Sequence, residues 1–346
     1  MDKILVTGAA GFIGSHLIDY CIKKEFEIYA LDRPNVSMRN LMHYTNNKEY
    51  FLKKDKNKIF GEKIKISSNK PNLSFIECDL KNSKLLEKII SNLRPKFIFH
   101  FGAQPYILPS WEDPRNTIEI NVIGTINIFE PLKNYKIDAK VIFAGTSAEF
   151  GSTANIGRPL KEDDPLLAIH PYGISKLASE LLGRQYFLNF GVKTLNLRFF
   201  NLTGTRRVND AASDFIRKIA QINLDLAEPV IEVGNLEPYR DILDVEDAVA
   251  GIWLVATKGR PGEVYHICSG KKVQIRELLK IALSLTEKKI EVIENVPEKL
   301  RTTDEDIIIG DNSKATSELG WKVTKNLKET LTDMFNYWID YYQSNL

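Results

Sequence analysis

Short apolar runs alternate along the chain with longer segments in which apolar residues recur at helical spacing. Residues 3–7 (KILVT) form the first apolar run, which stops at Gly8. Residues 15–24 then carry a helical pattern, and residues 27–32 (EIYALD) form a second apolar run. This order predicts a strand, a helix and a second strand, which is the βαβ unit of a parallel sheet.

The same alternation continues through the first two thirds of the chain. Further buried strands are predicted at 73–79, 96–101, 140–146, 193–200 and 263–269. Helices are predicted between most of them, at 82–93, 115–134 and 172–190. Strands that alternate with helices in this way predict an α/β protein with a Rossmann-type, doubly wound parallel sheet.

The last third of the chain has a different pattern. Amphipathic helices are predicted at 273–285 and 327–343, with a short strand at 289–294. We interpret this part as a smaller C-terminal α/β lobe. The expected division is a dinucleotide-binding domain of residues 1–201 plus 237–270, and a substrate-binding lobe of residues 202–236 plus 271–346.

One stretch between the second and third predicted strands departs from the alternation. Residues 48–70 are rich in lysine. A long, solvated surface insertion is the simplest interpretation. A flap over an anionic cofactor or substrate, or a contact between subunits, are the alternatives.

The composition excludes several classes of protein. The 346 residues carry 47 basic and 45 acidic side chains, so a net charge of +2 gives no global attraction for nucleic acid or membranes. The three cysteines are far apart, and neither they nor the histidines have the spacing of a metal site. No signal peptide or run of ~18 apolar residues is found. We therefore expect a cytoplasmic protein without a bound metal.

A glycine-rich turn follows the first predicted strand and opens the first helix. Gly8, Gly11 and Gly14 are spaced G-x-x-G-x-x-G, which differs from the standard G-x-G-x-x-G fingerprint. A pyrophosphate has to approach bare backbone N–H groups at a helix N-terminus, where larger side chains would block it. We therefore predict a dinucleotide site here, with Phe12 and Ile13 as further contacts.

An acidic residue ends the second predicted strand. Asp32 stands where a carboxylate binds the adenosine ribose hydroxyls, and it would repel a 2′-phosphate. This favours NAD, although Arg33 and Arg39 could pair with that phosphate, so NADP stays open. A turn-capping role is the alternative for Asp32.

Two later strands also end in candidate cofactor contacts. Asp79 and Leu80 follow the third main strand, and Asp79 could meet the adenine amine. Gly102, Ala103 and Gln104 follow the fourth. Ligands bind at the carboxyl edge of such a sheet, so these residues are predicted to line the cofactor site.

A tyrosine and a lysine stand four positions apart at the start of a predicted helix. Tyr172 and Lys176 would share one helix face. A free phenol, with a pKa of ~10, is a poor base at neutral pH, but a nearby ammonium stabilises the phenolate. Thr146 and Ser147 end a predicted strand and could hydrogen-bond the reacting oxygen. We predict an acid–base site for an alcohol that exchanges hydride; a solvated helix pair is the alternative.

Three motifs in this order, TGAAGFIG (7–14), GTSAEFG (145–151) and YGISK (172–176), resemble the extended short-chain dehydrogenase/reductase family that acts on nucleotide sugars. The resemblance covers nearly the whole chain. Stretches that resemble its branch of GDP-mannose 4,6-dehydratase and GDP-4-keto-6-deoxymannose reductase are RFFNLTG (198–204), VGNLEPYRD (233–241) and residues 300–321.

The resemblance implies roles for individual residues. Thr146 would bind the substrate hydroxyl, Tyr172 would be the base, and Lys176 would support it and contact the nicotinamide ribose. The resemblance to this branch implies a GDP-linked sugar, and the implied contacts to the nucleotide sugar are Asn201, Arg217, Asn235, Arg240 and Arg301. The helices at 115–134 and 172–190 pair with a second subunit in similar proteins, which implies a homodimer or homotetramer.

The reaction after C4 oxidation depends on a further acid–base residue. Similar dehydratases carry a glutamate two residues after the threonine, where this chain has Ala148; Glu149 comes one residue later. On a regular strand this shift would turn the carboxylate to the opposite face, unless a bulge brings it inward. A 4,6-dehydratase is the first interpretation, with Glu149 as a candidate catalytic residue. A 4-keto-sugar reductase and a 4-epimerase are the alternatives.

Overall fold

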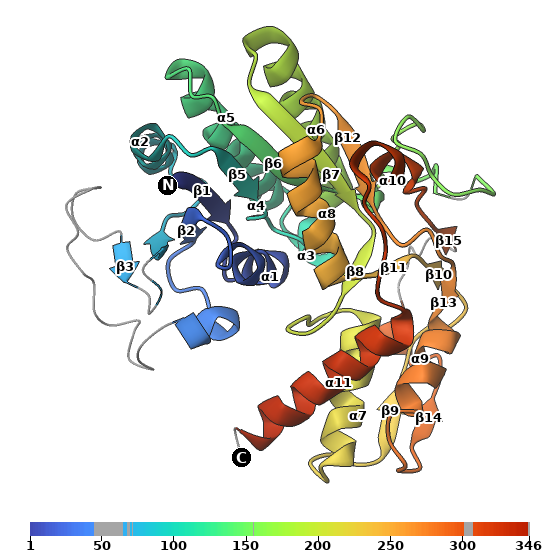
Figure 1. Cartoon of the computed structure of the whole chain (residues 1–346). Coiled ribbons are helices and arrows are strands. Elements are labelled where there is room, and N and C mark those ends of the chain that lie inside the picture. The colour runs from blue at the N-terminus through green and yellow to red at the C-terminus, as the bar shows by residue number, and fades with distance from the viewer. Residues whose placement is uncertain (45–64, 68–69, 71, 155, 301–306, 345–346) are drawn as a thin grey trace. The chain divides into compact units, whose positions relative to one another are not determined.

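The computed structural model describes residues 1–44, 65–67, 70, 72–154, 156–300 and 307–344 (Figure 1). Most of the lysine-rich stretch 48–70 and all of Arg301 lie outside these residues. The chain forms two compact units. The first comprises Met1–Gly151, Pro165–Arg198 and Ile252–Tyr265; the second comprises Ser152–Asp164, Phe199–Gly251 and His266–Leu346. That one domain binds the cofactor and the other the nucleotide sugar stays a prediction.

The main sheet follows the predicted doubly wound order. Its strands run β12-β7-β6-β5-β1-β2-β4-β3. β1 pairs in parallel with β2 and β5, β2 with β4, and β5 with β6, whereas β3 is antiparallel to β4. The strands are β1 (Asp2–Thr7), β2 (Phe26–Asp32), β3 (Lys65–Ser67), β4 (Leu73–Glu77), β5 (Phe97–His100), β6 (Lys140–Thr146), β7 (Lys193–Phe199) and β12 (Val264–Ile267). The Rossmann-type fold is therefore confirmed.

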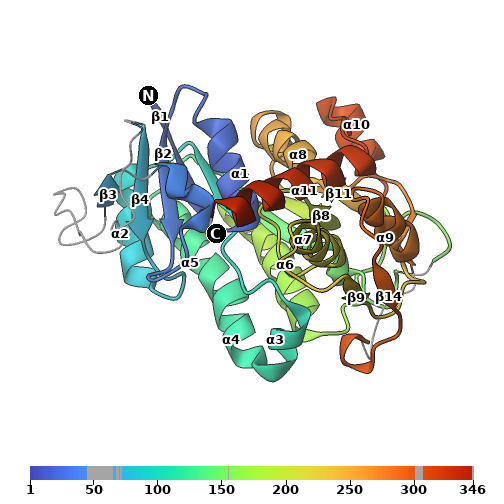
Figure 2. The ribbon, with the colours of Figure 1, turned by 90° about the horizontal axis from the view of Figure 1, so that it is seen from below.

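Helices cover both faces of this sheet (Figure 2). The chain moves outward from β1 to β4 and then returns past β1 to β5, β6 and β7, so right-handed crossovers place α1 on one face and α2, α5 and α6 on the other. The helices and helical turns of this part are α1 (Phe12–Cys21), η1 (Arg39–Tyr44), α2 (Ser83–Leu93), α3 (Ile107–Glu112), α4 (Pro114–Ile118), η3 (Glu119–Ile123), α5 (Gly124–Asn134), η4 (Ser147–Glu149) and α6 (Pro171–Phe190).

The strands are apolar throughout because both of their faces are covered. Leu5, Ile98 and Val141, from three neighbouring strands, are fully buried. They belong to one core cluster with Phe129 of α5 and Leu86 of α2. This core fixes the strand ends, and the predicted site residues follow those ends.

The helix predicted at 115–134 is interrupted by a π-helical turn, η3. The carbonyl of Asn121 in that turn accepts hydrogen bonds from the Thr125 hydroxyl (2.6 Å) and from the Ser179 hydroxyl of α6 (2.9 Å). These side-chain donors satisfy a carbonyl at the widened turn. The periodicity of apolar residues did not reveal the interruption.

The second unit has its own core. Trp338 and Met334 of α11 pack with Ile216 of α7 and Leu278 of α9. Small sheets β13-β10-β15, β11-β8 and β14-β9 complete it. The elements of this unit are β8 (Asn201–Thr203), α7 (Ala211–Asn223), β9 (Val230–Glu232), β10 (Tyr239–Arg240), β11 (Ile242–Asp244), β13 (Val273–Gln274), α9 (Ile275–Leu283), β14 (Glu291–Ile293), the helical turn η5 (Pro297–Lys299), β15 (Ile307–Ile308), α10 (Ser313–Leu319) and α11 (Leu327–Gln343). The helix α8 (Val245–Lys258) begins in this unit, and its residues from Ile252 onward belong to the first.

No helix in the described ranges is both long enough and apolar enough to cross a bilayer.

Candidate active site

The glycine turn between β1 and α1 leaves no room for side chains. Gly8 has a φ of 67°, and a Cβ placed on it would lie 2.6 Å from the backbone nitrogen of Gly102. A Cβ on Gly14 would lie 2.3 Å from the carbonyl oxygen of Gly8. Gly11 is the N-cap of α1, and no side chain caps this helix end. Its first N–H groups are therefore left to bind an anion.

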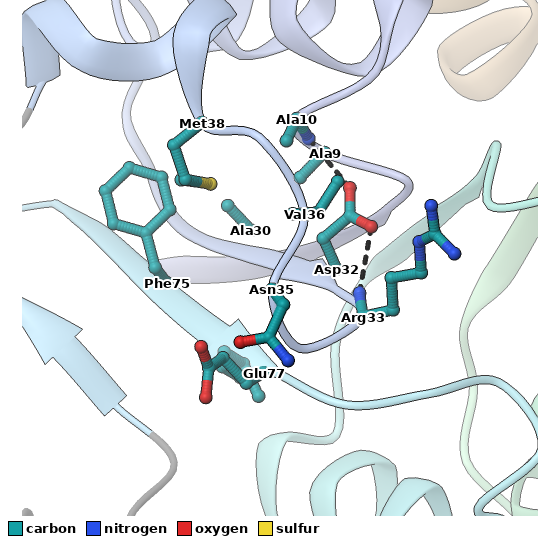
Figure 3. A pocket seen from close by; sticks show the side chains of 11 residues that line it. Ala9, Ala10, Ala30, Asp32, Arg33, Asn35, Val36, Met38, Phe75 and Glu77 are labelled. Carbon is teal, nitrogen blue, oxygen red and sulfur yellow. Dashed lines mark hydrogen bonds between the residues drawn. The ribbon is translucent and has the colours of Figure 1, made fainter. Parts of the chain in front are cut away.

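A pocket lies next to the glycine turn, between the ends of β1 and β2 and the neighbouring β4 (Figure 3). Met38 and Phe75 gather on one side, and Asp32 and Arg33 lie on the other. An apolar slot lined by polar groups, here with the carboxylates of Asp32 and Glu77, has the chemistry that an adenine ring and ribose hydroxyls need. The lining residues are Ala9, Ala10, Ala30, Asp32, Arg33, Asn35, Val36, Met38, Phe75, Ile76 and Glu77.

Asp32 holds the turn as well as facing the pocket. One carboxylate oxygen accepts the N–H of Ala10 (2.9 Å) and the other accepts the N–H of Arg33 (2.8 Å). Burial raises the pKa of Asp32, and these two hydrogen bonds act in the opposite direction. The capping and ligand-facing interpretations of Asp32 are thus compatible.

Asp79 was predicted to contact the adenine. It is not among the residues that line this pocket, and its carboxylate accepts the N–H of Lys81 at 2.8 Å. Its role stays a prediction. Leu80 is buried in the core, and a Cβ on Gly102 would lie 3.0 Å from its side chain. Glu77 and Asn35 are the polar residues at the pocket that the sequence did not indicate.

Residues after β5 form hydrogen bonds with α4 and with the π-helical turn η3. The N–H of Gln104 donates to the Asn121 side chain at 2.8 Å, and its side-chain amide donates to the Thr117 hydroxyl at 3.1 Å. The N–H of Gly102 donates to the Thr7 hydroxyl at 3.2 Å. Residues 102–104, with Ala103 between these two anchors, therefore keep a fixed place at the carboxyl edge of the sheet.

His100, at the end of β5, is a structural histidine. Its ring nitrogens lie 2.7 Å from the Thr7 hydroxyl and 3.0 Å from the Thr125 hydroxyl. Burial lowers the pKa of His100 to about 3, and the charge of Lys176 acts in the same direction. His100 is therefore neutral at physiological pH.

The N-terminus of α6 is anchored by side chains. Pro171 is its first residue, and the ring nitrogen Nδ1 of His170 caps the helix by accepting the N–H of Gly173 at 2.9 Å. The N–H of Tyr172 donates to the buried Ser110 hydroxyl of α3 at 3.1 Å. The rings of His170 and Tyr172 stack with their centroids 6.0 Å apart. The backbone that carries Tyr172 is therefore held on two sides.

Close packing fixes α6 against the end of β6. A Cβ on Gly173 would lie 2.6 Å from the carbonyl oxygen of Ala148. The ammonium of Lys176 donates to the carbonyl oxygen of Ala144 on β6 at 3.0 Å. Thr146 is the last residue of β6, and Ala148 lies two residues later, in the helical turn η4. The structure thus brings the first turns of α6 to the strand end that carries Thr146 and Ser147.

Lys176 is buried, with 8% of its surface exposed. Desolvation lowers the pKa of its ammonium to about 8, and the charge of Glu149 opposes this. This pKa makes the charge of Lys176 sensitive to its neighbours near neutral pH.

Glu149 is fully buried rather than exposed at the site. β6 ends at Thr146 and a single 3₁₀ turn follows, so the side-chain alternation of a strand does not extend to Glu149. Its Oε1 accepts the N–H of Thr146 at 2.7 Å. Its Oε2 lies 3.7 Å from the guanidinium nitrogen Nε of Arg198. Burial and the neighbouring Glu180 raise the pKa of Glu149, against the influence of Arg198.

The predicted nucleotide-sugar residues all belong to the second unit, apart from Arg301, which is not described. Asn201 is exposed, and Arg240 donates to the carbonyl oxygen of Tyr239 at 2.9 Å. The Asn235 side chain accepts the N–H of Glu237, and the guanidinium of Arg217 lies 4.9 Å from the Trp338 ring centroid. Their binding roles stay predictions.

Across the described part of the chain, no group of three or more histidine, cysteine, aspartate or glutamate side chains is arranged to hold a metal ion.

A family model described as GDP-mannose 4,6 dehydratase matches residues 5–334. The chain belongs to this family. This confirms the resemblance to the extended short-chain dehydrogenase/reductase proteins and the prediction of a nucleotide-sugar enzyme of that class.

Members of the family with different named activities are similar to this chain. GDP-6-deoxy-D-mannose reductase from Pseudomonas aeruginosa is 27% identical over 245 residues, which is 70% of this chain and 80% of the reductase. UDP-glucose 4-epimerase from Thermotoga maritima, solved with UDP-glucose, is 27% identical with a TM-score of 0.82, covering 99% and 100% of the two chains.

A third relative has been solved with a dinucleotide. It is a mutant of UDP-glucuronic acid 4-epimerase from Bacillus cereus, in complex with a fluorinated UDP-sugar and NAD. It is 26% identical with a TM-score of 0.79, covering 98% and 100% of the two chains. Family membership alone therefore leaves the reaction undecided between elimination, reduction and epimerisation.

Proposed function

We propose that this protein uses a nicotinamide cofactor to reduce the C4 ketone of a nucleotide-linked 4-keto sugar. The observation that carries the proposal is the anchoring of Tyr172 and Lys176 against the strand end at Thr146, on the same sheet edge as the glycine turn. This arrangement suits hydride exchange at a carbon that bears oxygen.

The residues at the site fit a dinucleotide. The glycine turn suits the pyrophosphate, and the pocket around Asp32 suits the adenosine. Bound nicotinamide would supply the hydride. Tyr172 would then donate its phenolic proton to the substrate oxygen, while Thr146 hydrogen-bonds that oxygen and Lys176 stabilises the phenolate that remains.

The environment of Glu149 favours reduction over the 4,6-dehydratase that was the first interpretation of the sequence. Elimination needs an acid–base group that reaches C5 and C6 of the sugar. Position 148 is alanine, and the carboxylate of Glu149 is buried against Thr146 and Arg198. A carboxylate held in this way is not exposed to the surface that a substrate would reach. The named reductase among the relatives agrees with this choice, and it makes a GDP-linked 6-deoxy-4-keto sugar the substrate to try first.

The change in mass of the sugar nucleotide and the amount of reduced cofactor consumed together distinguish the three reactions. We expect the purified protein to consume one reduced cofactor for each GDP-4-keto-6-deoxy sugar converted, and the product to gain two hydrogens. Mass spectrometry of the sugar nucleotide and the absorbance of the reduced cofactor measure both quantities. Loss of water from a GDP-hexose without net cofactor use would instead identify a dehydratase.

The same assay decides between the two cofactors. Asp32 lines the pocket that we propose for the adenosine, so a 2′-phosphate of NADP would lie close to its carboxylate. Two negative groups at ~4 Å repel each other by up to about 4 kcal/mol near a protein surface. Arg33, next to Asp32, offsets part of this repulsion. We propose NAD(H) as the preferred cofactor, so NADH should support faster turnover than NADPH.

A 4-epimerase is the second candidate. The epimerase structures among the relatives match nearly the whole chain, and epimerisation needs no acid–base group at position 148. An epimerase would change neither the mass of the sugar nucleotide nor the amount of reduced cofactor.

The exposed face of α6 supports assembly into a dimer. Ile174, Leu181 and Leu188 are spaced seven residues apart and are 48%, 56% and 66% exposed. This spacing places them along one side of the helix. We propose that this face packs against a second copy of the chain, as the resemblance implies.

A charge on that face should therefore separate the subunits. We expect light scattering to give a dimer or tetramer for the natural protein and monomers for Leu181→Glu, because burying an unpaired carboxylate is costly. Lys84→Glu, on an exposed part of α2, is the control and should not change the mass. A monomeric natural protein would refute the proposal.

A further inference from the structure

Two side chains from the segment after β2 hold the glycine turn at Ala10. The N–H of Ala10 donates to the Asp32 carboxylate at 2.9 Å. The carbonyl oxygen of Ala10 accepts a hydrogen bond from the side-chain amide of Asn40 at 3.0 Å. Both polar groups of this backbone position are therefore bonded to side chains that come from the far side of β2.

The backbone on either side of Ala10 is also held. The N–H of Ala9 donates to the carbonyl oxygen of Leu31 at 3.2 Å, and the N–H of Gly11 donates to the carbonyl oxygen of Gly8 at 3.0 Å. These N–H groups are used within the protein. An anion at the turn would therefore meet the N–H groups that follow, in the first turn of α1.

Asp32 and Asn40 stand at the two ends of a loop that forms one side of the pocket (Figure 3). The pocket residues between them are Arg33, Asn35, Val36 and Met38. Because both ends of the loop bond to Ala10, the loop is closed onto the glycine turn. The Asn40 bond therefore joins the pocket that we propose for the adenosine to the turn that we propose for the pyrophosphate.

Asn40 has a firm support of its own. It lies in η1, where Leu41 and Tyr44 are buried. The Tyr44 hydroxyl donates to a carboxylate oxygen of Asp19 in α1 at 2.8 Å, and a ring nitrogen of His43 lies 3.2 Å from the same oxygen. These contacts fix η1, and with it Asn40, against the helix that follows the glycine turn.

We propose that Asn40 is a positioning residue of the cofactor site, which fixes the pocket loop and the glycine turn relative to each other before the cofactor binds. Asn40 is not among the residues that line the pocket, so it acts through Ala10. A ligand that spans two parts of a site binds more tightly when those parts are already held in the right geometry. The inference rests on the proposed function only in that a dinucleotide lies across the turn and the pocket.

The proposal predicts a loss of affinity that depends on how much of the site a ligand uses. Adenosine would occupy only the pocket, inorganic pyrophosphate only the turn, and ADP both. Without the Asn40 bond, the binding of ADP has to order the loop against the turn, whereas the binding of either fragment does not. A side chain that only stabilised the fold would change none of these affinities in the folded protein.

Asn40→Leu tests this prediction, because leucine lacks the amide donor and has a branched side chain of similar size. We expect the affinities for ADP and NADH to fall about tenfold, and those for adenosine and pyrophosphate to stay within about twofold. Calorimetric titration measures ADP and NADH, and ligand-observed NMR measures the two fragments. Urea denaturation checks that the variant is folded.

Asn72→Leu is the matched control. The Asn72 amide donates to the carbonyl oxygen of Phe26 at 3.2 Å, and the side chain is partly buried like that of Asn40. This bond joins the starts of β2 and β4, whereas the pocket lies at their ends. The control should therefore bind all four ligands as the natural protein does.

Asn40→Ala removes the same hydrogen bond and replaces the leucine variant if that protein does not fold. A folded variant at position 40 that binds ADP as tightly as the natural protein would overturn the inference. Equal losses for ADP and adenosine would also overturn it, because Asn40 would then shape only the pocket. If the natural protein binds neither NADH nor ADP, the proposed function itself fails.

Discussion

Tyr172→Phe should lower turnover by roughly 10³-fold while NADH affinity stays within about twofold, since proton transfer by a positioned side chain contributes roughly 10²–10⁴-fold to a rate. The substitution removes one oxygen atom. The N–H of Tyr172 still donates to Ser110, and the ring still stacks on His170. Turnover with the 4-keto sugar nucleotide and a fluorescence titration with NADH measure the two quantities separately.

Tyr135→Phe is the matched control for this prediction. Tyr135 is 45% exposed, and its hydroxyl donates to Glu87 on the surface. Loss of that contact should change turnover little, because exposed pairs contribute about 0–1 kcal/mol even when charged. Wild-type turnover by Tyr172→Phe would show that another group delivers the proton, and the assignment of Tyr172 would then be wrong.

The fold could be predicted because buried parallel strands read as continuous apolar runs. β1, β2, β5 and β6 fall within one or two residues of the predicted ranges. The glycine turn and the Tyr172–Lys176 pair were identifiable for a related reason. Their chemistry depends on spacing along one local element, and sequence spacing records that directly.

The position of the Glu149 side chain could not be predicted from the sequence. The expectation of a flipped or bulged side chain assumed that the strand continues past Thr146, whereas β6 ends there. A signal was present, because Thr146 and Glu149 have the T-x-x-E spacing of a capping box. The partners Arg198 and Glu180 come from β7 and α6, and only the tertiary fold brings them to Glu149.

The pocket that we propose for adenosine was only partly predictable for a similar reason. Asp32 ends a strand, so its place was clear from the sequence. Val36 and Met38 lie in a loop that contains Asn35 with a φ of 63°, and Phe75 looked like an ordinary core residue of a buried strand. Their shared place depends on how the loop folds over β4. β4 ends at Glu77, two residues before Asp79, and a role for Asp79 as an adenine contact stays a prediction.

The glycine turn gives the second large prediction, because two glycines of the first unit form a matched pair. Gly8 and Gly191 have φ values of 67° and 70°, so alanine at either position carries the same left-handed strain of about 1–2 kcal/mol. They differ in surroundings. A Cβ on Gly8 would meet backbone atoms of Phe101 and Gly102 within 2.8 Å, whereas nothing lies within 4 Å of one on Gly191.

Gly8→Ala should therefore destabilise the protein by about 3 kcal/mol or more and weaken NADH binding roughly 100-fold. The added methyl group forces β1 and β5 apart at the strand ends that carry the turn. Gly191→Ala should cost only the left-handed strain and bind NADH as the natural protein does. Urea denaturation and an NADH titration of both variants provide the comparison. Equal losses of stability and affinity in the two variants would mean that close backbone contact at Gly8 does not shape the cofactor site.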